Sequence, residues 1–121
     1  MAQKPNPVDP DSDEAEQIRR DFGDKVNMTA SELEKWLDTD ESKDVGQKDG
    51  GESVGHESGR KIVEILQTNK RDLKAADLAH MKKVNGYVSR HLKQRPGKPK
   101  GELEDTAWTK SLRNWGHDPL K

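Results

Sequence analysis

The apolar residues of this chain gather in five separate windows, and within each window they recur at every third or fourth position. Such spacing places apolar side chains along one face of an α-helix. No run alternates polar residues with the β-branched residues that are typical of strands. Only 28% of the 121 residues are hydrophobic, which is enough for one small core. The pattern predicts a single small all-α domain of roughly four to five helices with a flexible N-terminus and flexible loops.

Capping signals set the expected ends of these helices. Asp11 and Glu14 have the spacing of a capping box, in which each side chain accepts a hydrogen bond from a free backbone N–H at the helix start. They predict a first helix over 12–24. Thr29 and Glu32 repeat this spacing and predict a second helix that ends near residue 38. Three further helices are expected over about 53–68, 74–94 and 105–115.

The segments outside these helices are polar and rich in glycine or proline. Residues 1–10 carry three prolines and are predicted to be a disordered tail, which leaves 11–121 as the helical domain. Residues 39–52 are predicted to be a mobile loop because they are polar and contain glycine. Residues 95–104 form a basic linker that begins with the sequence RPGKPKG.

Three tryptophans are expected to dominate this lean core, because each buries a large apolar area. We interpret Trp36, Trp108 and Trp115 as core or helix-docking residues rather than as a platform for nucleobases. Gly55 and Gly59 lie one turn apart on the third expected helix, so this face can approach another helix closely.

Charge is distributed unevenly along the chain. Residues 1–52 contain 7 Lys or Arg and 15 Asp or Glu, whereas residues 53–121 contain 15 and 8. The net charge is therefore −8 in the first part and +7 in the second. A basic region beside an acidic one is found in nucleic-acid-binding proteins. The alternative is that the two halves attract each other within the fold, so that the acidic half masks the basic one.

The fourth expected helix, 74–94, carries the best candidate binding surface. Its apolar stripe is centred on Met81 and Val88, and four cations fall on the opposite side: Lys82, Lys83, Arg90 and Lys93. With no carboxylate between them, these side chains can follow a phosphate backbone. The alternative is an ordinary solvated helix face. Tyr87, beside Arg90, is the local candidate for an aromatic residue on which a base could stack.

The third and fourth expected helices are joined by a short segment, as in a helix-turn-helix. In that motif the start of the second helix contacts the bases, but here it holds Ala75, Ala76 and Asp77. The match to a helix-turn-helix is therefore weak.

The basic linker adds Arg95, Lys98 and Lys100 to the candidate surface. It resembles an AT-hook, a short Gly-Arg-Pro element flanked by basic residues that lies in the narrow minor groove of A·T-rich DNA. Lys98 replaces the arginine of that element, and lysine is a poorer groove residue because it is more strongly hydrated and lacks the planar fork. The alternative is a basic solubilising linker.

No pattern in the chain indicates catalysis or a bound metal. The absence of cysteine excludes disulfides, thiol chemistry and cysteine-ligated zinc. His80 and His91 lie on one helix side but roughly 16 Å apart, too far to share an ion. His56 lacks the second histidine of a metalloprotease helix. His117 and Asp118 are expected to form local hydrogen bonds that fix the end of the chain. We therefore expect a non-enzymatic protein without a cofactor or metal.

Four runs resemble domain-of-unknown-function family 3140: VNMTASELEKWL (26–37), ESVGHESGRKIVEIL (52–66), AHMKKVNGYVSRHLKQRP (79–96) and SLRNWGHDPLK (111–121). The resemblance covers most of residues 18–121. The family occurs in bacteria and fungi, and some members are described as DNA-binding, so the resemblance implies DNA binding as one function. It assigns no catalytic residue. The linker GKPKGELE (97–104) is more basic than the family pattern, so any role of the linker in DNA binding belongs to this chain.

Three functional hypotheses follow. The leading one is a nucleic-acid-binding module for DNA or RNA that uses seven cations: Lys82, Lys83, Arg90, Lys93, Arg95, Lys98 and Lys100. The second is a protein-interaction or stress-associated accessory protein whose acidic N-terminal half binds a basic partner. The third is an unrecognised enzyme. The lean core is also compatible with a dimer.

The expected location is intracellular. The first residues lack the apolar segment of a signal peptide, and no apolar run approaches the roughly 18 residues that span a bilayer. We expect a cytoplasmic protein with no membrane partner, and keep the nucleoid or, in a eukaryote, the nucleus as alternatives.

Overall fold

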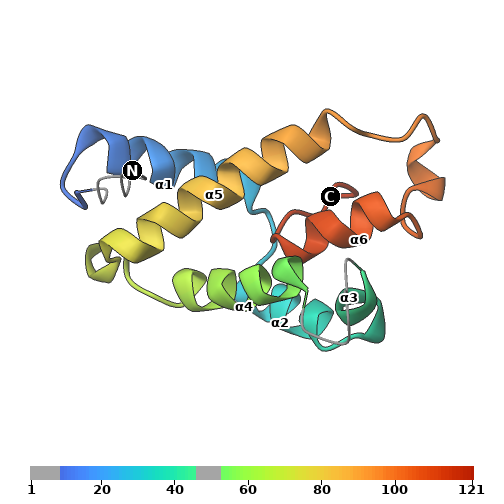
Figure 1. The fold of residues 1–121 in the computed structure, drawn as a ribbon, viewed down its shortest axis with the longest axis horizontal. Coiled ribbons are helices and arrows are strands. Elements are labelled where there is room, and N and C mark those ends of the chain that lie inside the picture. The colour runs from blue at the N-terminus through green and yellow to red at the C-terminus, as the bar shows by residue number, and fades with distance from the viewer. Residues whose placement is uncertain (1–8, 46–52) are drawn as a thin grey trace, which may run out of the picture.

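The computed structural model describes residues 9–45 and 53–121, and every regular element in these two ranges is helical (Figure 1). The α-helices are α1 (Asp13–Lys25), α2 (Ala30–Leu37), α3 (Asp40–Asp44), α4 (Val54–Leu66), α5 (Ala75–Leu92) and α6 (Ala107–Asn114). Two short 3₁₀ turns, η1 (Lys70–Asp72) and η2 (Lys100–Glu102), flank α5. The prediction of a small all-α domain is confirmed. The predicted disordered tail falls mostly on residues 1–8, which lie outside the described ranges.

Side-chain caps start most of the helices. The Thr29 hydroxyl accepts from the Glu32 backbone N–H at 3.1 Å, and the Glu32 carboxylate accepts from the Thr29 N–H at 2.9 Å, which confirms the predicted capping box. The predicted box at the start of α1 was wrong. Ser12 caps this helix instead, because its hydroxyl accepts from the backbone N–H of Ala15 at 3.1 Å.

The short helix α3 occupies part of the segment that the sequence predicted to be a loop. Thr39 caps it by accepting from the backbone N–H of Ser42 at 3.1 Å, and its first turn is acidic, which suits the positive end of a helix dipole. Ser42 is fully buried although α3 contains no apolar residue. The later part of the predicted loop, 46–52, lies outside the described residues.

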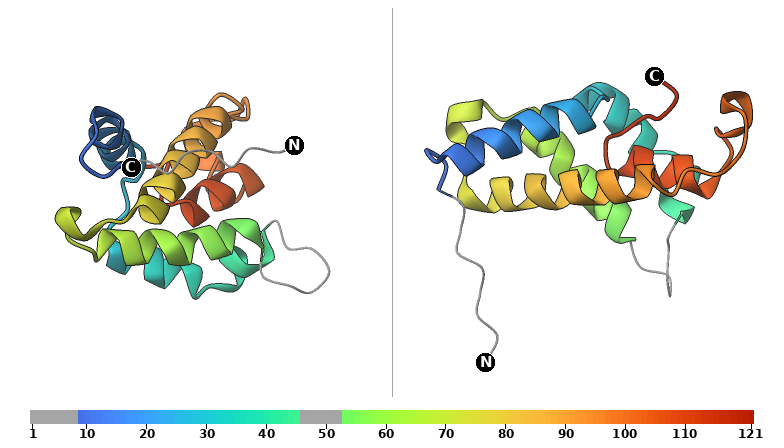
Figure 2. Two further views of the ribbon diagram at one scale, coloured as in Figure 1. Left: turned by 60° about the vertical axis from the view of Figure 1, so that its left-hand side comes forward. Right: turned by 90° about the horizontal axis from the view of Figure 1, so that it is seen from above.

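The longest helix, α5, crosses the molecule with α1 along one side, and both begin at the left-hand end in Figure 1. The view from above in Figure 2 shows the same pairing. Ala15, Ile18 and Phe22 form the buried stripe of α1. The stripe of α5 consists of four buried residues: Leu78, Met81, Val84 and Val88. The apolar side of α5 is therefore buried, largely against α1, and its opposite side is exposed to solvent.

Helices α2 and α4 form a second, antiparallel pair below α5 in Figure 1. The Leu37 carbonyl lies 2.8 Å from Nε2 of His56, and the Gln67 amide donates to the Glu34 carboxylate at 3.0 Å. Close approach depends on Gly59, because a Cβ atom there would lie 2.6 Å from the Asn114 carbonyl oxygen. The predicted close packing at this glycine is confirmed.

Helix α6 lies at the centre of the remaining contacts and touches α2, α3, α4 and α5. Its most connected residue is Asn114, which is buried and bonds to both Trp36 and Ser42. The chain leaves α6 through Gly116, whose φ of 80° is the left-handed conformation expected of a residue after a helix C-terminus. This turn directs the last residues back toward the connection between α1 and α2.

Candidate nucleic-acid interface

The exposed side of α5 carries four of the predicted cations. Lys82, Lys83, Arg90 and Lys93 are all exposed, as expected from their position opposite the buried stripe. Among the described residues, none of the four has an ion-pair partner; the pairs found are Arg20–Glu16, Lys61–Glu57, Arg113–Asp118 and Lys121–Glu32. We call these four residues the basic face of α5.

Gly86 shapes the middle of this basic face. A Cβ atom at Gly86 would lie only 3.1 Å from Nη1 of Arg90, so the guanidinium rests against the helix backbone one turn before its own Cα atom. The Arg90 guanidinium therefore lies beside the backbone at Gly86, in the middle of the basic face.

The three linker cations are also exposed, but the linker is not simply extended. Arg95, Lys98 and Lys100 project from the segment that leaves the C-terminal end of α5 and loops outward (Figure 1). The Lys98 N–H donates to the Pro96 carbonyl at 2.8 Å, which is a tight turn, and Lys100 begins η2. The extended conformation of an AT-hook is therefore absent from the described linker.

The acidic helix α1 does not cover the basic face. It packs on the apolar side of α5, and the Asn85 side chain bonds to the Ile18 carbonyl at 3.2 Å at this interface. The acidic residues of its first turn, Asp13, Glu14 and Glu16, are exposed to solvent. The acidic first turn of α1 and the basic face of α5 therefore do not pair with each other among the described residues.

Tyr87 is not available as a stacking platform, contrary to the prediction. Its ring stacks on Trp115 at a centroid distance of 4.1 Å and on His91 at 5.1 Å. Its hydroxyl lies 2.6 Å from the hydroxyl of Ser111. The wider stack also includes His80 on Trp115 and Trp108 on His91, each at 6.3 Å. These rings join α5 to α6.

The tryptophans behave as predicted. Trp108 and Trp115 are buried, and Trp36 is partly buried against the core. The Trp108 indole donates to the His91 carbonyl at 2.6 Å, and the Arg113 guanidinium lies over the Trp36 ring at 5.5 Å. The indoles of Trp36 and Trp108 therefore combine apolar burial with a polar or cationic contact.

His80 and His91 of α5 make contacts within the folded structure. Nε2 of His80 lies 2.9 Å from the Ser58 hydroxyl, and burial, together with the charges of Lys61 and Lys83, lowers its pKa. Burial also lowers the pKa of His91, whose Nε2 is enclosed and has no hydrogen-bond partner among the described residues. Within residues 9–45 and 53–121, no group of three His, Asp or Glu side chains is placed to bind a metal ion.

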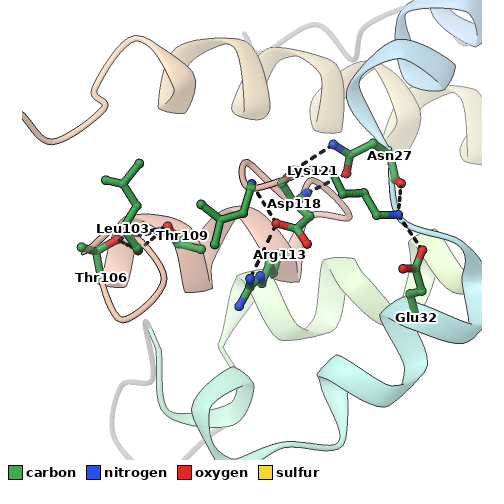
Figure 3. A network of polar contacts seen from close by, with 9 residues as sticks. Asn27, Glu32, Leu103, Thr106, Thr109, Arg113, Asp118 and Lys121 are labelled. Carbon is green, nitrogen blue, oxygen red and sulfur yellow. Dashed lines mark hydrogen bonds and ion pairs between the residues drawn. The ribbon is translucent and has the colours of Figure 1, made fainter. Parts of the chain in front are cut away.

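Sequence reasoning missed a polar clasp formed by the last residues (Figure 3). Asn27 and Asp118 exchange two hydrogen bonds of 2.7 and 2.9 Å, and His117 bonds through Nδ1 to the Lys25 carbonyl at 2.6 Å. Asp118 does form the predicted local bond, because its carboxylate accepts from the Leu120 N–H at 2.9 Å, but the partners in α1 and after it lie more than 90 residues earlier and were not predicted.

Lys121 completes this clasp from the exposed side. Its ammonium donates to the Asn27 carbonyl and to the Glu32 carboxylate, both at 2.7 Å (Figure 3). The Lys121 ammonium and the Thr29 backbone N–H lower the pKa of Glu32 to about 2. The carboxylate of the α2 capping box therefore also holds the end of the chain.

No helix within the described residues is both long and apolar enough to cross a bilayer. A search of curated proteins and of solved structures found no protein similar to this chain. A family model described as "Protein of unknown function (DUF3140)" matches residues 21–113. The match includes α2 to α5 and most of α6, and it ends before the clasp residues 114–121 that had contributed to the resemblance. Because the matched part is well over half of the chain, the protein belongs to the DUF3140 family.

Proposed function

We propose that this protein is a nucleic-acid-binding module rather than an enzyme, and that the basic face of α5 is its contact surface. The observation that supports the proposal most directly is the exposure of Lys82, Lys83, Arg90 and Lys93 on one helix side without carboxylate partners among the described residues. Unpaired cations on a rigid helix suit a phosphate backbone, because they release counterions from the nucleic acid without first breaking ion pairs.

The dimensions of the face suit several phosphates. Lys82 and Lys93 are separated by roughly 16 Å along the helix axis, which corresponds to roughly five base pairs of a duplex. The linker cations, Arg95 to Lys100, continue the positive charge beyond the end of α5 (Figure 1). The proposed contact is therefore with the backbone over about half a helical turn of nucleic acid.

The proposed binding mode is independent of base sequence. The Tyr87 ring is stacked on Trp115. Among the described residues, the basic face carries lysine and arginine without an exposed aromatic ring beside them. Phosphate contacts position a protein on nucleic acid but do not read its sequence. We expect duplexes of different sequence to bind with similar affinity, and duplex RNA to bind as well as duplex DNA.

A fluorescence-anisotropy titration of a short labelled duplex at two or more salt concentrations tests this function. If all four cations of the face contact phosphates, the logarithm of the binding constant falls with the logarithm of salt concentration at a slope of about −3.6. Replacing Lys82 and Lys83 with alanine reduces the steepness of that slope by about 2.

A matched control is offered by Lys35 and Lys43, which are exposed on α2 and α3. Their double alanine variant changes the net charge by the same amount but leaves the face of α5 intact. If both double variants weaken binding equally, only the net charge matters and the proposed surface is wrong. A wild-type protein that binds no duplex at low salt contradicts the function itself.

The exposed acid residues of α1 favour a second candidate, a binding site for a basic protein. Asp13, Glu14 and Glu16 lie together in the first turn, and within the described residues only Glu16 of these three has an ion pair, with Arg20. Removing the whole acidic half would also remove the core residues of α1 and α2. The sharper test compares the proteins captured by the wild-type chain with those captured by an Asp13→Asn, Glu14→Gln variant. Equal capture by both contradicts this role.

A further inference from the structure

A second positively charged surface lies away from the basic face, in a groove between the start of α1 and η1. The groove has a volume of about 510 Å³ and is lined by Pro10, Asp11, Arg19, Asn69, Lys70 and Arg71. Its two sides are about 50 residues apart in the sequence but adjacent in space, because α1 and α5 begin at the same end of the molecule (Figure 1). This end is opposite the one from which the basic linker leaves α5.

The charge of the groove is strongly unbalanced. Three cations, Arg19, Lys70 and Arg71, face one carboxylate, that of Asp11. Within the described ranges, none of these three cations has an ion-pair partner. The ion pairs found there involve other residues. The residues that line the groove therefore carry a net charge of +2 in a concave site, where the field of several cations adds.

Arg19 makes one hydrogen bond at the edge of this groove. Its side chain is only partly exposed, and Nη1 donates to the Pro10 carbonyl at 3.3 Å. Its Nε atom is enclosed and has no hydrogen-bond partner among the described residues. Holding a guanidinium partly away from water without a counter-ion costs free energy, and a bound anion offsets that cost.

The ligand chemistry follows from the donors. Guanidinium groups match the oxygen atoms of a phosphate in a bidentate geometry, and an ammonium group adds a point charge. Asn69 adds an amide whose side chain makes no capping bond to η1. No aromatic residue lines the groove, so it offers no surface on which a base could stack.

We propose that this groove binds a phosphate group through Arg19, Lys70 and Arg71. The site goes beyond the proposed backbone contact of α5, since it uses other elements and does not require a nucleic acid. The same phosphate chemistry is offered by a free phosphate compound and by the terminal phosphate of a strand.

The test for the site itself uses inorganic pyrophosphate and two-dimensional ¹H–¹⁵N NMR of the whole chain, with chloride at equal ionic strength as the reference. The expected result is saturable shifts of the backbone amides around Arg19 and Asn69 to Arg71. Arg71→Gln weakens pyrophosphate binding by about ten-fold or more, because a charge-assisted hydrogen bond is lost. Arg19→Gln has the same effect.

Arg20→Gln is the matched control, because Arg20 is next to Arg19 but is exposed and paired with Glu16. It leaves the affinity for pyrophosphate unchanged. Shifts that chloride reproduces, or equal weakening by Arg20→Gln and Arg71→Gln, overturn the proposal. Since Arg71 is exposed on η1, its variant keeps the test informative if Arg19→Gln fails to fold.

Two oligonucleotides distinguish the sources of the phosphate. Tighter binding of a 5′-phosphorylated strand than of its 5′-hydroxyl form, with the difference lost in Arg71→Gln, identifies a strand end as a ligand. If both strands bind equally and pyrophosphate binding is saturable, the ligand is a free phosphate compound. If the Lys82 and Lys83 variant loses duplex binding but keeps pyrophosphate binding, the two sites are separate. Failure of duplex binding alone contradicts only the function proposed for α5.

Discussion

The Trp36 indole donates a hydrogen bond to the side-chain oxygen of Asn114, 2.7 Å away and 78 residues later in the chain. The same oxygen accepts from the Ser42 hydroxyl, and the Asn114 amide donates to the Ser42 carbonyl at 3.1 Å. Asn114 is 1% exposed, and its two bonds to Ser42 are buried. One amide therefore joins α2, α3 and α6.

We predict that Asn114→Ala destabilises the protein by about 3 kcal/mol, because it leaves buried polar groups of Trp36 and Ser42 without partners. Ser42→Ala removes one hydroxyl and costs about 1 kcal/mol. Urea denaturation followed by circular dichroism measures both values. Equal costs for the two variants would show that Asn114 has no role beyond its bond to the Ser42 hydroxyl.

Two helical glycines are predicted to respond oppositely to alanine. At Gly59 the added methyl group would lie 2.6 Å from the backbone oxygen of Asn114 and from Cδ2 of Leu37, so the helices must separate at a cost of about 2 kcal/mol. At Gly23 on α1 the methyl group meets nothing within 4 Å, and the variant is stabilised by about 0.5–1 kcal/mol. Thermal denaturation of both single variants is the measurement. A stable Gly59→Ala protein would contradict the close approach of α4 and α6.

The stability of the protein is predicted to fall as the pH drops below 6.5. Burial lowers the pKa of His80 and His91 below the ordinary value of 6.5, with Lys61 and Lys83 contributing at His80. Below pH 6.5 the unfolded chain therefore binds more protons than the folded one, and the free energy of unfolding decreases until both imidazoles are protonated in the folded state. Urea midpoints measured between pH 8 and pH 5 follow this loss.

A double variant, His80→Gln with His91→Gln, provides the control for this pH dependence. Its urea midpoint is expected to change less between pH 7 and pH 5 than that of the wild type, because the two shifted groups are gone. The same pH dependence in both proteins would assign the effect to other groups.

The clasp predicts an unusual titration of Glu32. Its pKa is lowered from 4.5 to about 2, first by the Lys121 ammonium and then by the Thr29 N–H. Lys121→Met is expected to move this pKa back toward 4.5, and ¹³C NMR of the side-chain carboxyl reports it. In the wild type the stabilisation by this carboxylate is complete above pH 4.5 and is lost as the pH falls toward 2. An unchanged Glu32 pKa in Lys121→Met would contradict the ion pair.

The parts of the fold that sequence analysis predicted correctly depend on signals within about one helical turn. Thr29 and Glu32 are three residues apart, and the period of α5 alone places Lys82 and Lys93 opposite its buried stripe. Helix α3 lacked such a signal, because it contains no apolar residue and is anchored by Ser42 through a partner on α6.

The wrong cap at the start of α1 was a local error, but other errors arose where distant segments meet. Tyr87 lies beside the basic face in the sequence, but the stacking that covers it comes from Trp115, 28 residues later. The groove at Arg19 and Arg71 was likewise not predicted, since neither segment alone carries a phosphate-binding pattern. No local spacing encodes either arrangement, so only the packed structure reveals them.

The position of Asn114 and the clasp has a consequence for synthesis of the protein. A ribosome releases the chain from its N-terminal end, so α2, α3 and α4 emerge before the residues that join them. The connection between α1 and α2 likewise meets its partners, His117 and Asp118, only after α6 has been made. Contacts this distant in sequence slow folding, because long loops must close before they form. Most of the domain's cooperative folding is therefore expected only after residues 107–121 have left the ribosome.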